Sequence, residues 1–124
     1  MIKTITIVND FSQSPYGRNE YDVTPEEYKN TGKAFRETLL APALRDKSND
    51  KVIVVLTGYN RYGRSFLDEA FGGLIRKEGF TYQELLERLE YKHDTVKSIV
   101  NLISERLVKA AKDLGQLPDE DILG

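Results

Sequence analysis

Apolar and polar positions along the chain change their period several times, and each period predicts an element. Residues 4–7 alternate threonine with isoleucine, the period of two expected for a half-buried strand. Residues 52–56 form a continuous apolar run, which is typical of a strand buried on both faces. Such a strand needs helices on at least one side of its sheet. A shorter alternation at 89–92 predicts a brief further strand.

Three stretches show the longer period of an amphipathic helix. The first, residues 31–44, contains Pro42, which is expected to kink or loosen its last turn. The second, residues 66–79, contains a pair of glycines at 72–73. Because glycine is a poor helix former, we expect a neighbouring group to approach the backbone closely there. The third and longest stretch runs from residue 94 to a stop at residue 115.

Capping signals refine these boundaries. Thr81 and Glu84 form the T-x-x-E capping box of a short helix, and Asp94 is the predicted cap of the long helix. Residues 9–30 are rich in turn formers and predict a long loop, with a weak strand signal at 21–23. This order of elements predicts an α/β fold with a small mixed sheet and helices mainly on one face.

Composition narrows the class of protein. The 124 residues suit one domain, predicted over residues 1–115, followed by an acidic C-terminal tail at 116–124. A net charge of −2 gives no general attraction to nucleic acid or membrane, and no apolar stretch has the length of a membrane span or a signal peptide. The chain has no cysteine and one histidine, His93, interpreted as a surface residue. We therefore expect a cytoplasmic protein without metal or cofactor.

The chemistry of greatest interest lies where the second predicted strand meets the second helix. The sequence GYNRYGRS at 58–65 is one residue away from the phosphate-binding loop G-x-x-x-x-G-K-[ST]. An anion- or nucleotide-binding loop would use Gly58, Gly63, Arg64 and Ser65, because a helix N-terminus favours negative charge. Arginine in place of lysine and the short chain argue against nucleotide hydrolysis.

A simpler interpretation of the same residues is structural. Ser65 and Asp68 form S-x-x-D in front of an apolar helical run, so Ser65 is predicted to cap the helix. Asp68 and Glu69 are adjacent, and adjacent helical residues do not share a face, so they are not expected to act as a facing pair. Asp10, Ser12 and Arg18 could gather near a sheet edge, although their turn-rich surroundings favour a plain loop.

Tyrosines and an arginine in the same connection favour a protein-binding patch. Tyr59, Arg61 and Tyr62 lie in a loop expected to be exposed, and these residue types dominate protein interfaces. The same mixture could stack on single-stranded nucleic acid, but the acidic balance of the chain makes that a minor alternative.

Residues 52–90 also resemble the STAS-like domain family of unknown function. The signature of that family is a strand followed by a segment whose positions are here Tyr62, Gly63, Ser65, Phe66, Leu67, Asp68, Glu69, Ala70, Phe71, Gly72, Gly73 and Leu74. Residues 10–12, 15–18 and 34–44 match the N-terminal half of the family, so the resemblance extends over roughly residues 9–107.

The resemblance implies a role similar to that of anti-sigma-factor antagonists, which dock onto a GHKL-type kinase or ATPase. In those antagonists an Asp-Ser-Ser-Gly-Leu motif stands at a strand–helix junction, and its second serine accepts phosphate. Placed on this chain, the motif falls on residues 63–67, which makes Ser65 the phosphoacceptor candidate. Gly63, Arg64 and Phe66 replace the aspartate, the first serine and the glycine of the motif.

The leading prediction is a non-enzymatic regulatory domain that binds a protein partner through the strand–loop–helix junction. The residues expected to contact the partner are Tyr59, Arg61, Tyr62, Arg64, Asp68 and Glu69. No arrangement of residues supports catalysis or metal binding. The alternative is the anion- or nucleotide-binding module, and the oligomeric state is not predicted.

Overall fold

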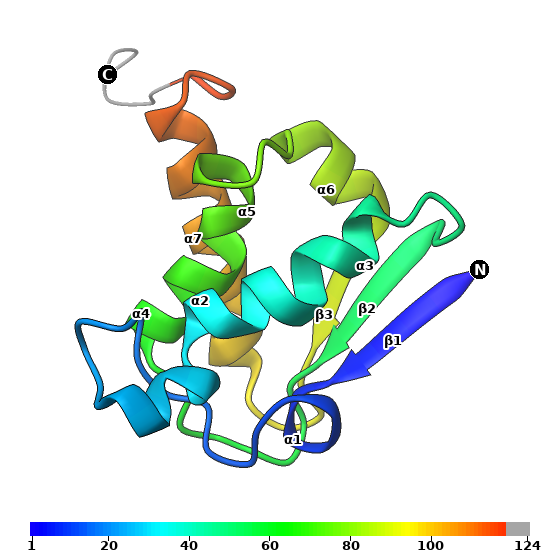
Figure 1. Ribbon diagram of the computed structural model, residues 1–124. Helices are drawn as coiled ribbons and strands as arrows, with labels where there is room; N and C mark the ends of the chain where they lie inside the picture. The colour runs from blue at the N-terminus through cyan, green and yellow to red at the C-terminus, as the bar shows by residue number, and fades with distance from the viewer. Residues whose placement is uncertain (119–124) are drawn as a thin grey trace.

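A three-stranded parallel sheet forms one layer of the protein. The computed structural model describes residues 1–118, and the predicted acidic tail from 119 onward lies outside the described residues. The strands β1 (Ile2–Thr6), β2 (Lys51–Val55) and β3 (Leu89–Lys92) are arranged in the order β1-β2-β3, as Figure 1 shows. The register pairs Ile2 with Lys51 in one ladder and Val52 with Leu89 in the other. All strands are parallel, whereas the sequence predicted a mixed sheet.

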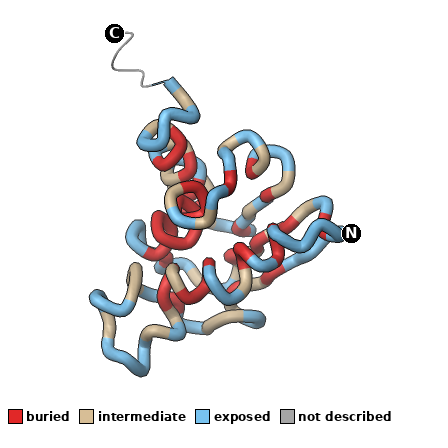
Figure 2. Tube along the Cα trace, turned by 45° about the horizontal axis from the view of Figure 1, so that its top comes forward, coloured by how far each residue is buried: buried red, intermediate tan, exposed pale blue. Residues whose placement is uncertain are grey.

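The helices lie on one face of this sheet, as predicted for the α/β class (Figures 1 and 2). Val52 and Val54 on β2 and Leu89 on β3 point toward the helices and are buried. Ile53 and Val55 point the other way and remain half-buried. The expectation that β2 is buried on both faces is therefore wrong, because no helix within residues 1–118 covers the second face.

The first long helical segment is continuous but changes its winding twice. It consists of α2 (Gly32–Phe35), the π-helical turn η2 (Arg36–Leu40) and α3 (Ala41–Arg45). Pro42 stands at the start of α3, directly after the widened turn, which agrees with the predicted distortion of this helix.

The second segment repeats this construction. It consists of α4 (Arg64–Leu67), the π-helical turn η3 (Asp68–Gly72) and α5 (Gly73–Arg76). Gly73 is required at its position because a Cβ there would overlap the guanidinium of Arg36. The close neighbour expected at the glycine pair is thus a charged side chain from the first helical segment.

Two further helices complete the layer. The capping box of α6 (Tyr82–Arg88) is confirmed: the Glu84 amide donates to Thr81 Oγ1 at 3.1 Å, and the Thr81 amide donates to Glu84 Oε1 at 2.9 Å. Helix α7 (Lys97–Asp113) buries an apolar stripe against the other helices, as predicted. Its predicted cap is wrong, because α7 begins at Lys97 with Val96 as N-cap residue, so Asp94 is too far upstream.

Two helical turns that the sequence pattern did not reveal lie at the start of the predicted long loop and within it. These are α1 (Ile7–Asp10) and the 3₁₀ helix η1 (Pro25–Asn30), which begins with a capping box of Thr24 and Glu27. The weak strand signal at 21–23 was misleading, since these residues form turns.

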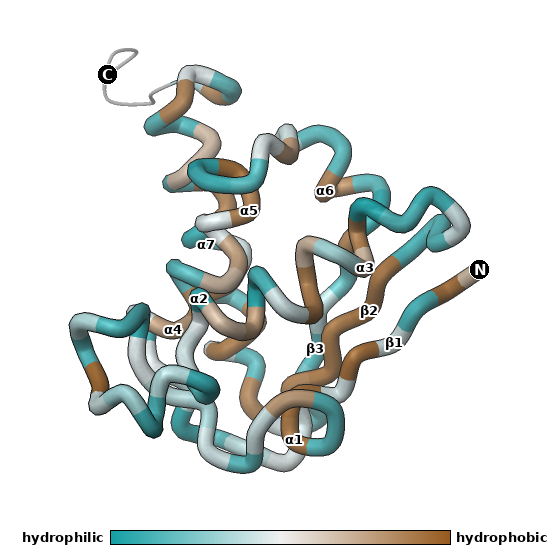
Figure 3. The backbone as a smooth tube through the Cα atoms, viewed as in Figure 1, coloured by the Kyte–Doolittle hydropathy of each residue, from teal (hydrophilic) through white to brown (hydrophobic). Residues whose placement is uncertain are grey.

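The core lies between the sheet and the helices. Figure 3 shows apolar residues along β2 and on the inward sides of the helices. Gln116 and Leu117, assigned to the tail by sequence, contact the domain: the Tyr82 amide donates to Gln116 Oε1 at 2.7 Å, and Leu117 packs against the core. No helix within residues 1–118 is both long enough and apolar enough to cross a membrane.

Candidate functional site

The loop between β2 and α4 is anchored at its beginning. Gly58 has a φ of +102° and packs against the side chain of Val8, so a larger residue would be strained there. The next carbonyl, that of Tyr59, lies 3.0 Å from Nε2 of His93. Nδ1 of His93 accepts the amide protons of Thr95 and Val96 at 3.1 and 3.0 Å, so the ring proton is on Nε2 and is donated to Tyr59. His93 is therefore buried, and its interpretation as a surface residue is wrong. We call it the His93 clasp, because its ring joins the Tyr59 carbonyl to the amides of Thr95 and Val96.

An aromatic cluster fixes the middle of the loop. The rings of Tyr59 and Tyr62 meet edge to face at 4.9 Å, and Tyr62 lies 5.8 Å from Phe66. Tyr62 is only 7% exposed, and its hydroxyl has no hydrogen-bond partner among the described residues. Burial raises the pKa of this hydroxyl, and the nearby Tyr59 raises it further. Tyr62 is thus a core residue, contrary to the expectation of an exposed contact.

The exposed part of the junction is small and basic. Arg61, Arg64 and Ser65 are exposed, together with Asn60 and Gly63. No carboxylate within residues 1–118 lies in ion-pair distance of Arg61 or Arg64. The two guanidinium groups of the junction are therefore available to a negatively charged ligand or partner.

Ser65 does not cap the helix. Helix α4 begins at Arg64, and its N-cap is Gly63, with extended backbone angles and no side-chain bond to the first turn. The amide of Leu67 donates to the Gly63 carbonyl at 3.1 Å, which fixes the N-cap two residues before Ser65. The predicted cap is therefore wrong, and the serine hydroxyl is left exposed on the first turn.

The start of α4 faces the N-terminal loop across a cavity. Its volume is about 400 Å³, and its lining residues are Tyr16, Gly17, Asp22, Gly63, Arg64, Ser65 and Phe66. The loop wall is held by α2, because the amides of Gly32 and Lys33 donate to the carbonyls of Gly17 and Arg18, each at 3.0 Å. Two segments distant in sequence thus form one concave surface around Ser65.

One turn beyond Ser65, the acidic pair is buried. Asp68 is 9% exposed and Glu69 is 7% exposed, so neither can belong to an exposed contact surface as predicted. Arg18 Nη1 lies 2.8 Å from Asp68 Oδ2 and 3.8 Å from Glu69 Oε1. The two carboxylates share this arginine because they open the π-helical turn η3, whose extra residue shifts the usual angular spacing of side chains.

Further arginines surround the same pair. Arg76 Nη2 donates to Asp68 at 2.8 Å, and Arg106 Nη1 approaches Asp68 at 3.9 Å. Burial opposes the charge on Asp68, but the hydrogen bonds and charges of Arg18 and Arg76 outweigh it and lower the pKa of the carboxyl group. Asp68 is therefore ionised at neutral pH and its charge is neutralised by partners within the chain.

A second group of charges joins the two helical segments. Arg36, 2% exposed, donates to the carboxylate and the carbonyl of Glu69, at 2.5 and 2.6 Å, and to Glu78 at 2.9 Å. Arg45 completes this group with a bond of 2.8 Å to Glu78. Burial disfavours the charge on Glu78, but the bonds from Arg45 and Arg36 prevail and lower its pKa.

Sequence reasoning did not anticipate this buried charge network. Arg18, Asp10 and Ser12 each have a different partner: Arg18 donates to Asp68, Asp10 accepts the Thr6 amide, and Ser12 donates to Asn30. One signal for the network was available, because Arg36 shares its predicted helical face with Leu40 and Ala43. An arginine that is buried on an apolar face needs a charged or hydrogen-bonding partner.

The architecture and the junction define an α/β domain in which a strand, a loop and an exposed serine lead into a helix packed on one side of the sheet. A family described as a STAS-like domain of unknown function matches residues 31–98. The match spans more than half of the chain and includes β2, the junction and β3, so the chain belongs to this family of STAS-like domains. No curated protein and no solved structure matches the chain.

Proposed function

We propose that this STAS-like domain is a non-enzymatic, cytoplasmic regulatory module that binds a protein partner through the exposed part of the junction. Its contact residues are Arg61, Arg64 and Ser65, with the loop wall of Tyr16 and Asp22 across the cavity. The main support for the proposal is that Ser65 is exposed at the start of a helix that it does not cap. A serine that contributes no capping bond is available for modification or for contact.

Electrostatics at the junction support phosphorylation of Ser65 as the switch. A phosphate on the first turn of α4 interacts favourably with the free amides and the helix dipole. Arg64 and Arg61 can form charge-assisted hydrogen bonds with it. Asp68, one turn further on, would repel a phosphate, but its charge already faces Arg18 and Arg76.

The class of partner comes from the resemblance to anti-sigma-factor antagonists. It suggests a protein with a GHKL-type kinase or ATPase domain, which would contact the serine and its surroundings directly. The fixed loop suits such a partner, because the His93 clasp and the tyrosine pair hold the exposed residues in one arrangement before binding.

Capture of partners from the native host tests this proposal. The wild-type chain should retain a protein that Arg61→Ala and Ser65→Asp fail to retain. Ser98→Asp is a matched control, because Ser98 is also the exposed second residue of a helix that lacks a side-chain cap. Lys47→Ala controls for the loss of an exposed positive charge elsewhere. Equal recovery by all variants would contradict the proposed surface.

Two measurements separate the switch from the nucleotide alternative. Intact-mass analysis of the protein from its own host should find a species heavier by one phosphoryl group, mapped to Ser65. Calorimetric titration with ATP and GTP, with and without Mg²⁺, should give no heat of binding. Saturable heat that Arg64→Ala abolishes would favour the anion- or nucleotide-binding module of Gly58, Gly63, Arg64 and Ser65 instead.

A further inference from the structure

The outer edge of β3 has unpaired main-chain groups. The Leu56 amide donates to the Lys92 carbonyl at 2.8 Å, so Lys92 faces β2. Because main-chain groups alternate in direction along a strand, those of Leu89 and Tyr91 point away from β2. The Leu89 amide is used by the Leu85 carbonyl. The Leu89 carbonyl and both main-chain groups of Tyr91 have no strand beside them within residues 1–118. Such an edge can accept a further strand.

We propose that this edge pairs in antiparallel fashion with the β3 edge of a second copy of the chain, with Tyr91 opposite Tyr91. The two residues would exchange both of their main-chain hydrogen bonds, and the two sheets would join into one of six strands. Two-fold symmetry is the commonest arrangement for soluble oligomers. The inferred surface is distant in sequence from Ser65 and does not depend on its proposed role.

Charge complementarity identifies a second copy as the occupant. In a pair centred on Tyr91, Glu90 of each copy stands opposite Lys92 of the other, on the same face of the joined sheet. Lys92 is exposed and has no carboxylate within ion-pair distance among the described residues. Glu90 already meets Lys51 of its own copy at 2.9 Å. Pairing would therefore create a row of alternating charges across the interface between the two copies: Lys51, Glu90 and the second copy's Lys92.

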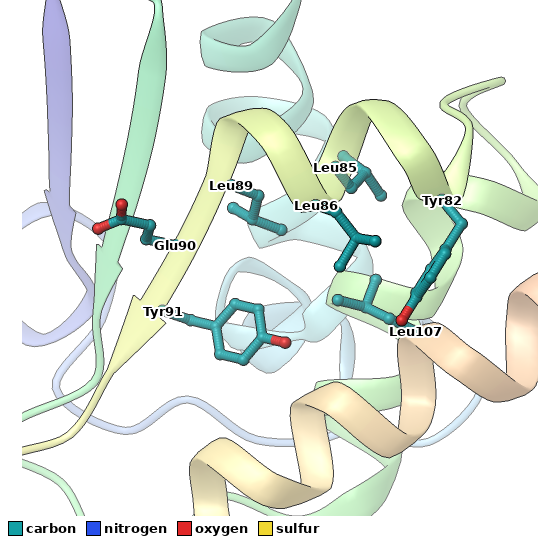
Figure 4. A pocket seen from close by; sticks show the side chains of 7 residues that line it. All are labelled: Tyr82, Leu85, Leu86, Leu89, Glu90, Tyr91 and Leu107. Atoms are coloured by element: carbon teal, nitrogen blue, oxygen red, sulfur yellow. The ribbon is translucent and has the colours of Figure 1, made fainter.

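An apolar groove beside the edge provides surface for burial. Its volume is about 300 Å³, and its lining residues are Tyr82, Leu85, Leu86, Leu89, Glu90, Tyr91 and Leu107. In Figure 4 it lies on the side of β3 away from β2, between β3, α6 and α7. Leu86 is 57% exposed in the single copy, so covering it on pairing would remove apolar surface from water.

The opposite edge of the sheet lacks this self-complementarity. Strand β1 is also unpaired on its outer side within the described residues. An antiparallel pair centred on Thr4 would set Lys3 opposite Ile5, which places a charge against an apolar residue. Both edges carry an exposed lysine, but only on β3 does the lysine stand opposite a glutamate of the second copy, so β3 is the edge that the residues favour.

A charge-swap experiment tests the pairing by sedimentation over concentrations from micromolar to millimolar. Lys92→Glu sets glutamates opposite each other at positions 90 and 92. The double variant Lys51→Glu/Glu90→Lys sets lysines opposite each other at the same positions, and it keeps an ion pair between positions 51 and 90 within each copy. Each variant alone should dimerise about tenfold more weakly than the wild type. An equimolar mixture should recover dimers, because each glutamate then meets a lysine. Lys3→Glu, on the β1 edge, should leave dimerisation unchanged.

Three results would overturn the proposal. The wild type could remain a monomer at millimolar concentration, which would indicate that the edge is free or serves an extended segment of another protein. The dimer could be insensitive to charge at positions 90 and 92, which would place the interface elsewhere. The mixture could also fail to recover dimers although circular dichroism shows both variants folded.

Discussion

Two helices of this protein begin with the same kind of sequence signal, and only one uses it. Thr81 and Glu84 form a complete capping box at α6. Ser65 and Asp68 have the same spacing at α4, yet Ser65 makes no cap and Asp68 faces the interior. The difference is that Thr81 is the N-cap of α6, whereas Gly63 is the N-cap of α4 and Asp68 is bound by Arg18 and Arg76. A short-range signal fails when long-range charge pairing claims one of its residues.

The largest expected loss of stability follows from removing Arg36, the arginine that pairs with acidic residues in the interior. Arg36→Met should lower the free energy of unfolding by about 3–5 kcal/mol, because the buried Glu69 would lose its closest partner and Glu78 would keep only Arg45. Urea unfolding followed by circular dichroism measures the loss. Lys33→Met is the control on the same helix, because its ion pair with Glu20 is at the surface and should matter little. Equal losses would contradict the role assigned to the buried pairs.

Acid should remove the stabilisation that Asp68 contributes to the folded protein. The pKa of Asp68 is lower in the folded protein than its ordinary value of 3.8, so the unfolded chain binds the proton more tightly. The stabilisation by Asp68 is therefore complete above pH 4, and it decreases as the pH falls toward the folded pKa. Asp68→Asn should destabilise the protein at pH 7, and the gap to the wild type should narrow in acid. Asp113→Asn, at a surface pair, should show a small effect at both pH values.

Removing the two hydroxyls compares the helix starts directly. Thr81→Ala should cost about 1 kcal/mol of stability, because the Glu84 amide loses its acceptor. Ser65→Ala should change stability by less than about 0.5 kcal/mol, since no capping bond is lost. Unfolding curves of both variants under the same conditions measure the two losses of stability. A loss at Ser65 as large as that at Thr81 would restore the capping interpretation.

A negative charge at the start of α4 tests the electrostatic environment of Ser65. Ser65→Asp should stabilise the protein by about 0.5 kcal/mol through the helix dipole, and the gain should shrink in high salt. Ser98→Asp, at the same position of α7, should behave alike. Destabilisation confined to Ser65→Asp would show that Asp22, across the cavity, outweighs the dipole and Arg64.

Periodicity predicted most of the fold because local residues determine it. The three strands, the amphipathic stripes and the capping box of α6 lie within a few residues of their expected positions. Errors arose where partners are distant in sequence. Asp94 was the predicted cap of α7, but its amide donates to Thr57 Oγ1, which is 37 residues away in the sequence.

The sequence placed the candidate site at the correct segment of the chain, but it did not show which side chains of that segment are buried. The family signature and the glycines mark the strand–loop–helix junction, and Arg61 and Arg64 are exposed as expected. Tyr62 and the acidic pair are buried instead. The acidic pair lies in a π-helical turn and binds Arg18, which is 50 residues away from Asp68 in the sequence. Neither feature follows from helical spacing, so contact residues could not be separated from core residues.

The histidine clasp makes the junction spectroscopically accessible. The chain has one histidine, so its imidazole nitrogens give one set of ¹⁵N resonances without any labelling strategy beyond uniform enrichment. The chemical shifts of Nδ1 and Nε2 differ strongly between tautomers, and here they should report a proton on Nε2 shared with the Tyr59 carbonyl. Any ligand that displaces this loop would shift that signal, so the native sequence contains its own reporter of binding.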